Sequence, residues 1–212
     1  MKQDDQEKTL LGMLLLFFVV YTACAVLLQI RSDELPSKSA AAVDMFTGGL
    51  FWVMSIIGIL MAAIRSKTIM KALIWLGVSA GCGALAIDEI FEFHEATRYV
   101  VGDDDYIKIA TLPIALIGLY ILYRIEKPAQ RVIAFFLVGL GFHALYIVSD
   151  MGDGDFFQLP FPEITLLWAE EMLELLSLQS YLTGFLLHYT IVSRSSNSHV
   201  EPMDDDSGVK TA

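Results

Sequence analysis

The chain has 212 residues, which is enough for one domain, and 55% of them are hydrophobic. This share, with a mean hydropathy of +0.57, is higher than a soluble domain of this size carries, so lipid is the expected solvent for most of the chain. The formal net charge is −11. This acidic balance argues against nucleic acid as a partner.

Six stretches are long and apolar enough to cross a bilayer, which takes roughly 20 mostly apolar residues in a helix. In chain order they are residues 9–30, 45–64, 72–87, 106–123, 132–149 and 162–193. The third continues past Ile87 into an acidic segment that reaches Glu95. The sequence thus predicts an all-α, polytopic membrane protein folded as a six-transmembrane-helix bundle, with membrane lipids as its surroundings.

The first stretch is a transmembrane helix rather than a cleaved signal peptide, because its apolar part is too long and no small-residue cleavage pattern follows it. In the fourth stretch, Lys108 lies where its stem can reach the interface, and Pro113 predicts a kink. The sixth begins at Pro162, a favoured first position of a helix.

The orientation follows from the basic residues in short loops, which stay on the cytoplasmic side. Such residues lie before the first stretch and in the loops after the second and the fourth: Lys2, Lys8, Arg65, Lys67, Lys71, Arg124, Lys127 and Arg131. The loops at 103–105 and 150–155 are acidic and should face outward. Both termini are then cytoplasmic, and a bacterial-type cytoplasmic (inner) membrane is the expected location.

Three parts follow from this topology. Residues 1–8 form a cytoplasmic N-terminal tail, residues 9–193 form the six-helix transmembrane domain, and residues 194–212 form a cytoplasmic tail. The last part is rich in Ser and Asp, a composition typical of disorder.

Carboxylates inside the third stretch are the most informative feature, since each costs very roughly 2.5 to 3.5 kcal/mol near the centre of a membrane. One stripe at helical spacing holds Gly77, Gly81, Ala84, Asp88, Glu92 and Glu95. Paired small residues allow close helix packing. We therefore expect this stripe, with its acids, to face the interior of the bundle.

The fifth and sixth stretches carry further polar groups at helical spacing. In the fifth, one stripe holds Phe136, Gly139, His143, Tyr146 and Asp150. In the sixth, Glu170, Glu171 and Glu174 are followed on the same side by Ser177 and Tyr181. Counting 1.5 Å per residue from the outer ends places Asp88 and His143 roughly 10 Å deep and the three glutamates roughly 12 to 18 Å deep. Three helices should therefore bring ionisable groups to a similar depth.

Lys and Arg are absent from these parts of the three helices, so the acids must be protonated, reached by water or bound to a cation. The sequence predicts a metal site near the outer leaflet. Its ligands are expected among Asp88, Glu92, Glu95, His143, Asp150, Glu170, Glu171 and Glu174, surrounded by Glu89, His94, Tyr146 and Tyr181. So many oxygen donors favour a divalent Fe, Mn, Mg or Ca ion, with Zn as the alternative.

The expected function is a metal-dependent membrane hydrolase or oxidase acting on a lipid-like substrate, in which the metal activates water or dioxygen. Three alternatives stay open at this point. The acids could form the relay of a proton- or cation-coupled transporter, or bind a partner in a noncatalytic subunit. They could also line only a shallow, water-filled vestibule.

Overall fold

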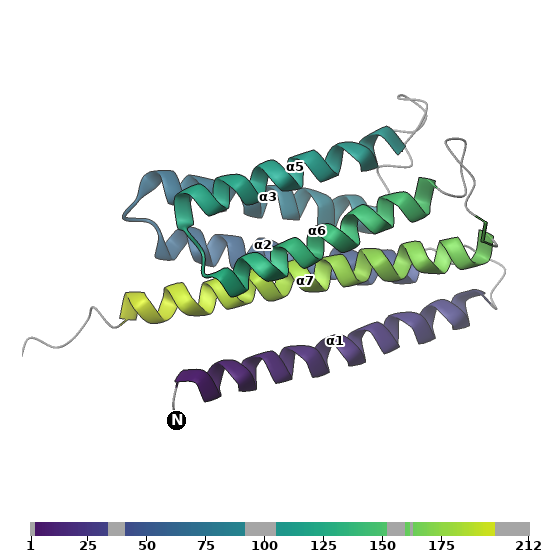
Figure 1. Ribbon diagram of the computed structural model, residues 1–212, viewed down its shortest axis with the longest axis horizontal. Coiled ribbons are helices and arrows are strands. Elements are labelled where there is room, and N and C mark those ends of the chain that lie inside the picture. Colours follow the sequence, from purple (N-terminus) through teal and green to yellow (C-terminus); the bar gives the residue numbers. More distant parts are fainter. Residues whose placement is uncertain (1–2, 34–40, 92–104, 152–159, 162, 198–212) are drawn as a thin grey trace, which may run out of the picture.

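A computed structural model describes residues 3–33, 41–91, 105–151, 160–161 and 163–197 (Figure 1). Within these ranges the ordered elements are helices, and no strand occurs. The helices are α1 (Gln3–Asp33), α2 (Ala41–Ile64), α3 (Ile69–Phe91), α5 (Asp105–Glu126), α6 (Gln130–Met151) and α7 (Glu163–Asn197). The all-α, six-helix prediction is confirmed.

Each helix is longer than the apolar stretch that predicts it, because the helix continues beyond that stretch at one or both ends. Residues 3–8 of the expected N-terminal tail belong to α1, and residues 194–197 of the expected C-terminal tail belong to α7. The remainder of the C-terminal tail lies outside the described residues. α5 continues through Pro113 without ending there.

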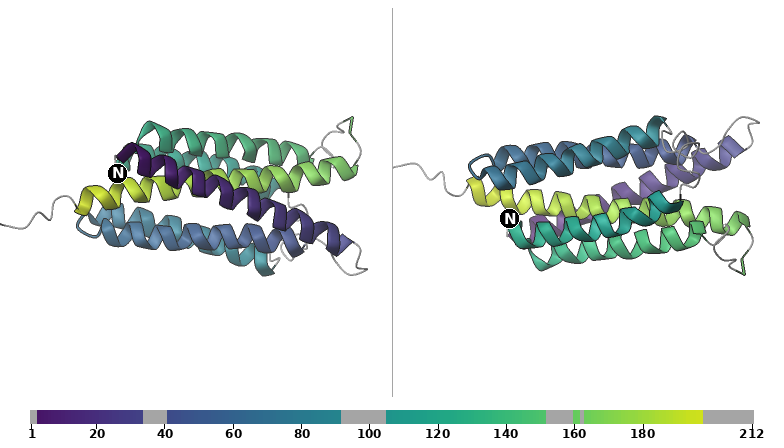
Figure 2. Two further views of the ribbon diagram at one scale, coloured as in Figure 1. Left: turned by 90° about the horizontal axis from the view of Figure 1, so that it is seen from below. Right: turned by 90° about the horizontal axis from the view of Figure 1, so that it is seen from above.

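All six helices contain a segment long and apolar enough to cross a membrane, which is compatible with an integral multi-pass membrane protein. α7 is the most buried of them, and α1 and α5 are the least buried. α7 packs closely on α6 and also contacts α2 and α1, while α3 packs on α2 and α5 on α6. Figures 1 and 2 show the helices running along one common axis, with α1 lying across α2 and α7.

The contact between α2 and α3 is made at small residues. The Ser55 and Ser79 hydroxyls each donate to the carbonyl oxygen of the other serine, at 2.9 and 2.8 Å. A Cβ atom on Gly58 would lie 2.9 Å from the Cβ atom of Ser79, so only glycine fits at this approach. The two helices are therefore held backbone to backbone.

The prediction that Gly77 and Gly81 face the interior is wrong. Both are exposed, and a Cβ atom on either would meet nothing within 4 Å. The buried stripe of α3 runs instead through Trp75, Ser79 and Ala86. The reason is that the small residues of α2, Gly48 and Gly58, supply the close approach, so the side chains of α3 fill the space opposite them.

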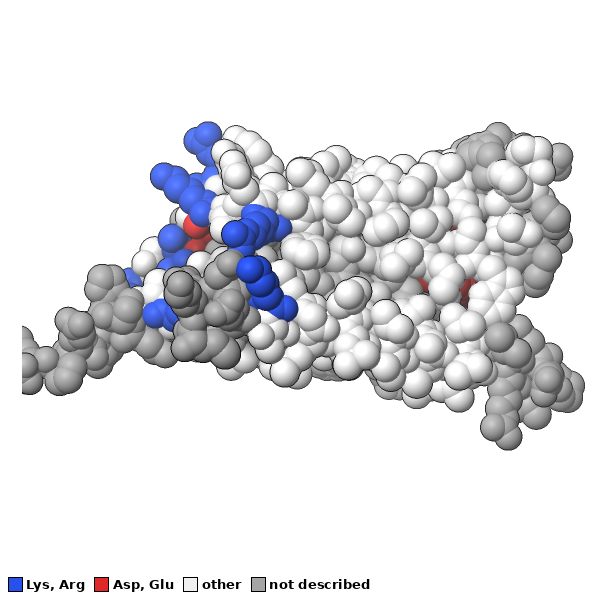
Figure 3. Space-filling model, turned by 60° about the horizontal axis from the view of Figure 1, so that its bottom comes forward, with Lys and Arg blue, Asp and Glu red and all other residues white. Residues whose placement is uncertain are grey.

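The two ends of the bundle differ in charge. The turns between α2 and α3 and between α5 and α6 lie at the same end as the start of α1 and the end of α7 (Figure 1). We call this the basic end, after Arg65, Lys67, Lys71, Arg124, Lys127 and Arg131. Figure 3 shows Lys and Arg gathered there around a small area of Asp or Glu. Toward the other end of the same face, Asp and Glu are visible only as small recessed areas. We call the other end, which carries Asp88 and Asp150, the acidic end.

Candidate functional site

The acidic end contains a cluster of carboxylates centred on Tyr146 of α6. Four of them lie close enough to the Tyr146 side chain to act on it electrostatically: Glu174, Glu170, Asp150 and Glu89, with Glu174 acting most strongly. They come from α3, α6 and α7. We call these five residues the Tyr146 cluster. Carboxylates of three helices thus lie near this phenol.

The α6 side of the cluster follows the stripe expected from the sequence. Phe136 and Gly139 are buried, and His143, Tyr146 and Asp150 are half-buried. A Cβ atom on Gly139 would lie 2.7 Å from the ring of Tyr181, so the absence of a side chain at this position lets α7 approach. At Gly139 this stripe therefore packs against α7.

The α3 side differs in its details from the prediction. Glu89 continues the buried stripe of α3, since it follows Ala86 by three residues. The Glu89 Cβ atom also lies 3.4 Å from the position that a Cβ atom on Gly48 would take. Asp88 is half-buried one position earlier, about 100° around the helix. Glu89, which was expected only at the edge of the site, is thus the α3 residue that acts on Tyr146.

On α7, the three glutamates are all half-buried, and the Glu171 Oε2 atom is fully buried, like the Asp150 Oδ2 atom of α6. Near Asp150, the Ser149 hydroxyl donates to the Leu166 carbonyl oxygen at 3.2 Å and fixes α6 against the first turn of α7. This bond therefore sets the level of Asp150 relative to the start of α7.

His143 lies beside the cluster, and its ring centroid is 5.7 Å from that of Tyr146. Its Nε2 atom is 2.7 Å from the Thr111 hydroxyl oxygen of α5, at hydrogen-bonding distance. In this arrangement Nε2 is committed to α5. A metal at His143 would use Nδ1 or displace Thr111.

Three of the predicted site residues, Glu92, His94 and Glu95, lie outside the described residues. In the part of the chain that the structure describes, no three His, Cys, Asp or Glu side chains are gathered around a point where a metal ion could bind. The donor chemistry suits a hard cation. The described side chains would have to move inward to surround one.

A second buried polar group occupies the basic end and centres on Glu126, at the end of α5. Its side chain is 1% exposed, and its Oε2 atom lies 2.6 Å from Arg65 Nη2 and 3.8 Å from Lys71 Nζ. The indole nitrogen of Trp75 donates to Oε1 at 3.2 Å. His188 of α7 stacks on Trp75, with its Nε2 atom 3.8 Å from Oε2. We call these five residues the Glu126 cluster.

The Glu126 cluster joins α5 to the turn after α2, to α3 and to α7. The Glu126 carboxylate lies beside two cations and accepts a hydrogen bond from the Trp75 indole, so its ionised form is stabilised. His188 is 3% exposed. It offers a buried imidazole within 4 Å of this carboxylate, on the same helix as Glu174.

An aromatic layer separates the two clusters. Phe185 makes edge contacts with Phe136 and Trp75, with ring centroids 5.4 and 5.7 Å apart. On α7 the buried Ser177 and half-buried Tyr181 lie between Glu174 and this layer, and His188 lies beyond it. Glu174, Ser177, Tyr181, Phe185 and His188 follow one another at steps of three or four residues, so they share one face of α7.

Sequence reasoning missed the Glu126 cluster, since Arg124, Lys127 and Arg131 led to the interpretation of residues 124–131 as a loop. The signal was an acid within a basic turn, together with Trp75 and His188 at the matching ends of two apolar stretches. Their proximity depends on how α3, α5 and α7 pack, which spacing alone does not give.

The comparisons with known proteins add one finding. A family model described as "Domain of unknown function (DUF8692)" matches residues 13–189, which covers α2 to α6 and most of α1 and α7. No curated protein matches the chain, and no solved structure does.

Proposed function

Because the chain belongs to the DUF8692 family, whose description assigns no function, we propose a function from the geometry of the site. We propose that the protein spans a membrane six times, binds a divalent metal ion at the Tyr146 cluster, and acts as a hydrolase or oxidase on a lipid-like substrate. The observation that supports this is that four carboxylates from three helices lie near enough to one tyrosine to act on it electrostatically.

Four carboxylates so placed repel one another, and partial burial weakens the screening by water. Binding a divalent cation removes this repulsion and draws the acids inward. The oxygen donors favour Fe, Mn, Mg or Ca, with Zn as the alternative. Such an ion would activate water or dioxygen.

The chain's own groups have assignable roles in this proposal. Glu174, Glu170 and Asp150 would hold the ion, Tyr146 would donate a hydrogen bond to a substrate oxygen, and His143 would link the site to α5 through Thr111. Asp88, Glu171, Glu92 and Glu95 are the further ligand candidates, with His94 and Tyr181 at the edge.

We also propose the orientation that the basic loops indicate, with the basic end and both termini in the cytoplasm and the acidic end outside. In a bacterial-type inner membrane, the Tyr146 cluster would then open toward the outer leaflet. A cysteine introduced at Asp104 should be labelled from outside intact cells by a membrane-impermeant maleimide. Protection from labelling would reverse the orientation.

The metal is tested by elemental analysis of detergent-purified protein and by thermal unfolding with added Mn²⁺, Fe²⁺, Mg²⁺, Ca²⁺ or Zn²⁺. We expect bound metal in the parent and its loss in Glu174→Gln. The matched control is Glu126→Gln, which removes one carboxylate at the opposite end and should keep the metal in its folded fraction. No metal in the parent, together with no stabilisation by any of the five ions, would overturn the proposal.

A second candidate is proton- or cation-coupled transport, and the Glu126 cluster favours it. A relay needs ionisable groups toward both faces, and Glu126 with His188 provides them at the basic end while the Tyr146 cluster provides them at the acidic end. Proton flux into liposomes that disappears in both His188→Gln and Glu174→Gln would support transport. Flux equal to that of empty liposomes would exclude it, and absence of both flux and metal would favour a noncatalytic subunit.

A further inference from the structure

The turn between α5 and α6 adopts a backbone conformation that its sequence does not favour. α5 ends at Glu126 and α6 begins at Gln130, so three residues make the connection. The first, Lys127, has φ of 48°, in the left-handed region that glycine or asparagine usually occupies after a helix. A lysine at this position places a charged side chain where glycine would fit without strain.

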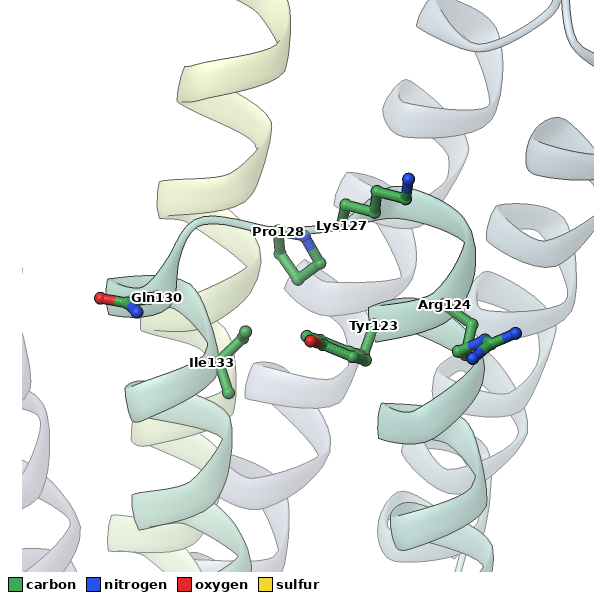
Figure 4. Close-up of a pocket in the computed structure, with 6 residues that line it drawn as sticks. All are labelled: Tyr123, Arg124, Lys127, Pro128, Gln130 and Ile133. Carbon is green, nitrogen blue, oxygen red and sulfur yellow. The ribbon is translucent and has the colours of Figure 1, made fainter.

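This turn closes one end of a groove between α5 and α6. The groove has a volume of about 730 Å³ and is lined by Tyr123, Arg124, Lys127, Pro128, Gln130 and Ile133. Figure 4 shows Tyr123 and Ile133 facing each other between the two helices, with Pro128 at the turn above them. Arg124, Lys127 and Gln130 spread around the rim, with their polar ends directed away from the floor.

The groove thus has an apolar floor and a basic rim. We infer that it binds an anionic phospholipid, with the first part of an acyl chain against Tyr123 and Ile133 and the phosphate beside Lys127 and Arg124. A pocket of this size holds a ligand of drug-like dimensions, which corresponds to a headgroup and the upper part of its chains.

The surroundings fit a lipid better than a soluble anion. α5 is among the least buried helices, and its side chains Ile117 and Tyr120 beside the groove are largely exposed, as expected for a surface that faces acyl chains. Basic side chains at the end of a membrane helix lie at the level of lipid phosphates, where anionic headgroups attract them. Arg124 is also held near the Tyr120 ring, 6.0 Å from its centroid.

The test compares phosphatidylglycerol and phosphatidylcholine with identical acyl chains, added to the delipidated full-length protein and measured by native mass spectrometry. We expect the parent to retain phosphatidylglycerol preferentially. Lys127→Gly and Arg124→Gln should each weaken that retention about fivefold, as expected for one basic side chain near an anionic headgroup. Lys127→Gly should unfold at no lower temperature than the parent, because glycine accepts φ near 48°.

The matched control is Lys67→Gln, which removes one exposed positive charge at the same end without lining the groove. It should leave the lipid preference unchanged, whereas Tyr123→Ser should lower it by removing part of the floor. Equal losses in Lys67→Gln and Lys127→Gly would overturn the inference, since any basic charge would then serve. The inference would also be overturned if the protein bound glycerol phosphate as well as it binds phosphatidylglycerol, because the site would then accept a free anion.

Discussion

The guanidinium of Arg65 lies 2.6 Å from the carboxylate of Glu126, across 61 positions of sequence, and fastens the end of α5 to the turn after α2. The Glu126 side chain is almost fully buried, while that of Arg65 is 25% exposed. Partial removal of water therefore strengthens the attraction between the two charges, while the cost of burying both of them completely is avoided.

Glu126→Gln should lower the free energy of unfolding by about 2 kcal/mol, because the amide keeps the shape but leaves Arg65 and Lys71 without their carboxylate. Thermal unfolding in detergent measures the loss. The Arg65→Gln and double variants should give a coupling of about 1 kcal/mol or more. Strictly additive effects would show that the contact contributes nothing.

Gly58→Ala should destabilise the α2–α3 pair by about 2 kcal/mol, because the new methyl group would overlap the Ser79 backbone. Gly77→Ala on α3 is the matched control: its methyl group meets open space, and alanine is the better helix former. It should be as stable as the parent or more so. Thermal unfolding of both variants in one detergent decides this, and equal melting temperatures would contradict the packing.

Gly139→Ala should disturb the candidate site through packing, since its methyl group would overlap the ring of Tyr181 and push α7 from α6. A stability loss of about 1–3 kcal/mol is expected. If the metal proposal holds, affinity for the ion should also fall. Gly141→Ala, whose methyl group meets nothing within 4 Å, should change neither quantity.

Thr111→Val should loosen the start of α5 by removing the hydroxyl that contacts His143. A hydrogen bond between membrane helices contributes about 0.6 kcal/mol, so a small loss of stability is expected. Hydrogen exchange along the first turns of α5 should speed up. Thr190→Val is the control, because its hydroxyl donates to the Leu186 carbonyl oxygen within α7. Equal exchange rates in both variants would argue against the α5 link.

The sequence is sufficient to predict the number, order and approximate position of the helices, because crossing a bilayer requires long apolar stretches that are easily recognised. It also predicts the inner face of α6, where Gly139, His143 and Tyr146 follow helical spacing. Periodicity defines which residues share a stripe.

Periodicity does not decide which stripe of a helix faces its neighbours, and this is why the prediction for α3 failed. Gly77 and Gly81 are a plausible contact by composition, but the glycines of α2 already provide the close approach. The inner stripe therefore ends at Glu89. In lipid, apolar side chains on either face are equally tolerated, so hydrophobicity gives no further guide.

The Glu126 cluster also bears on how the protein is made. Its members enter the chain in the order Arg65, Lys71, Trp75, Glu126 and His188, and the last of them belongs to α7. During synthesis the Glu126 carboxylate can meet its cations once α5 has emerged, but its cover by His188 must wait for α7. The basic end of the bundle is therefore completed only after α7 has been made, so a chain that stops before residue 188 leaves the Glu126 carboxylate without this cover.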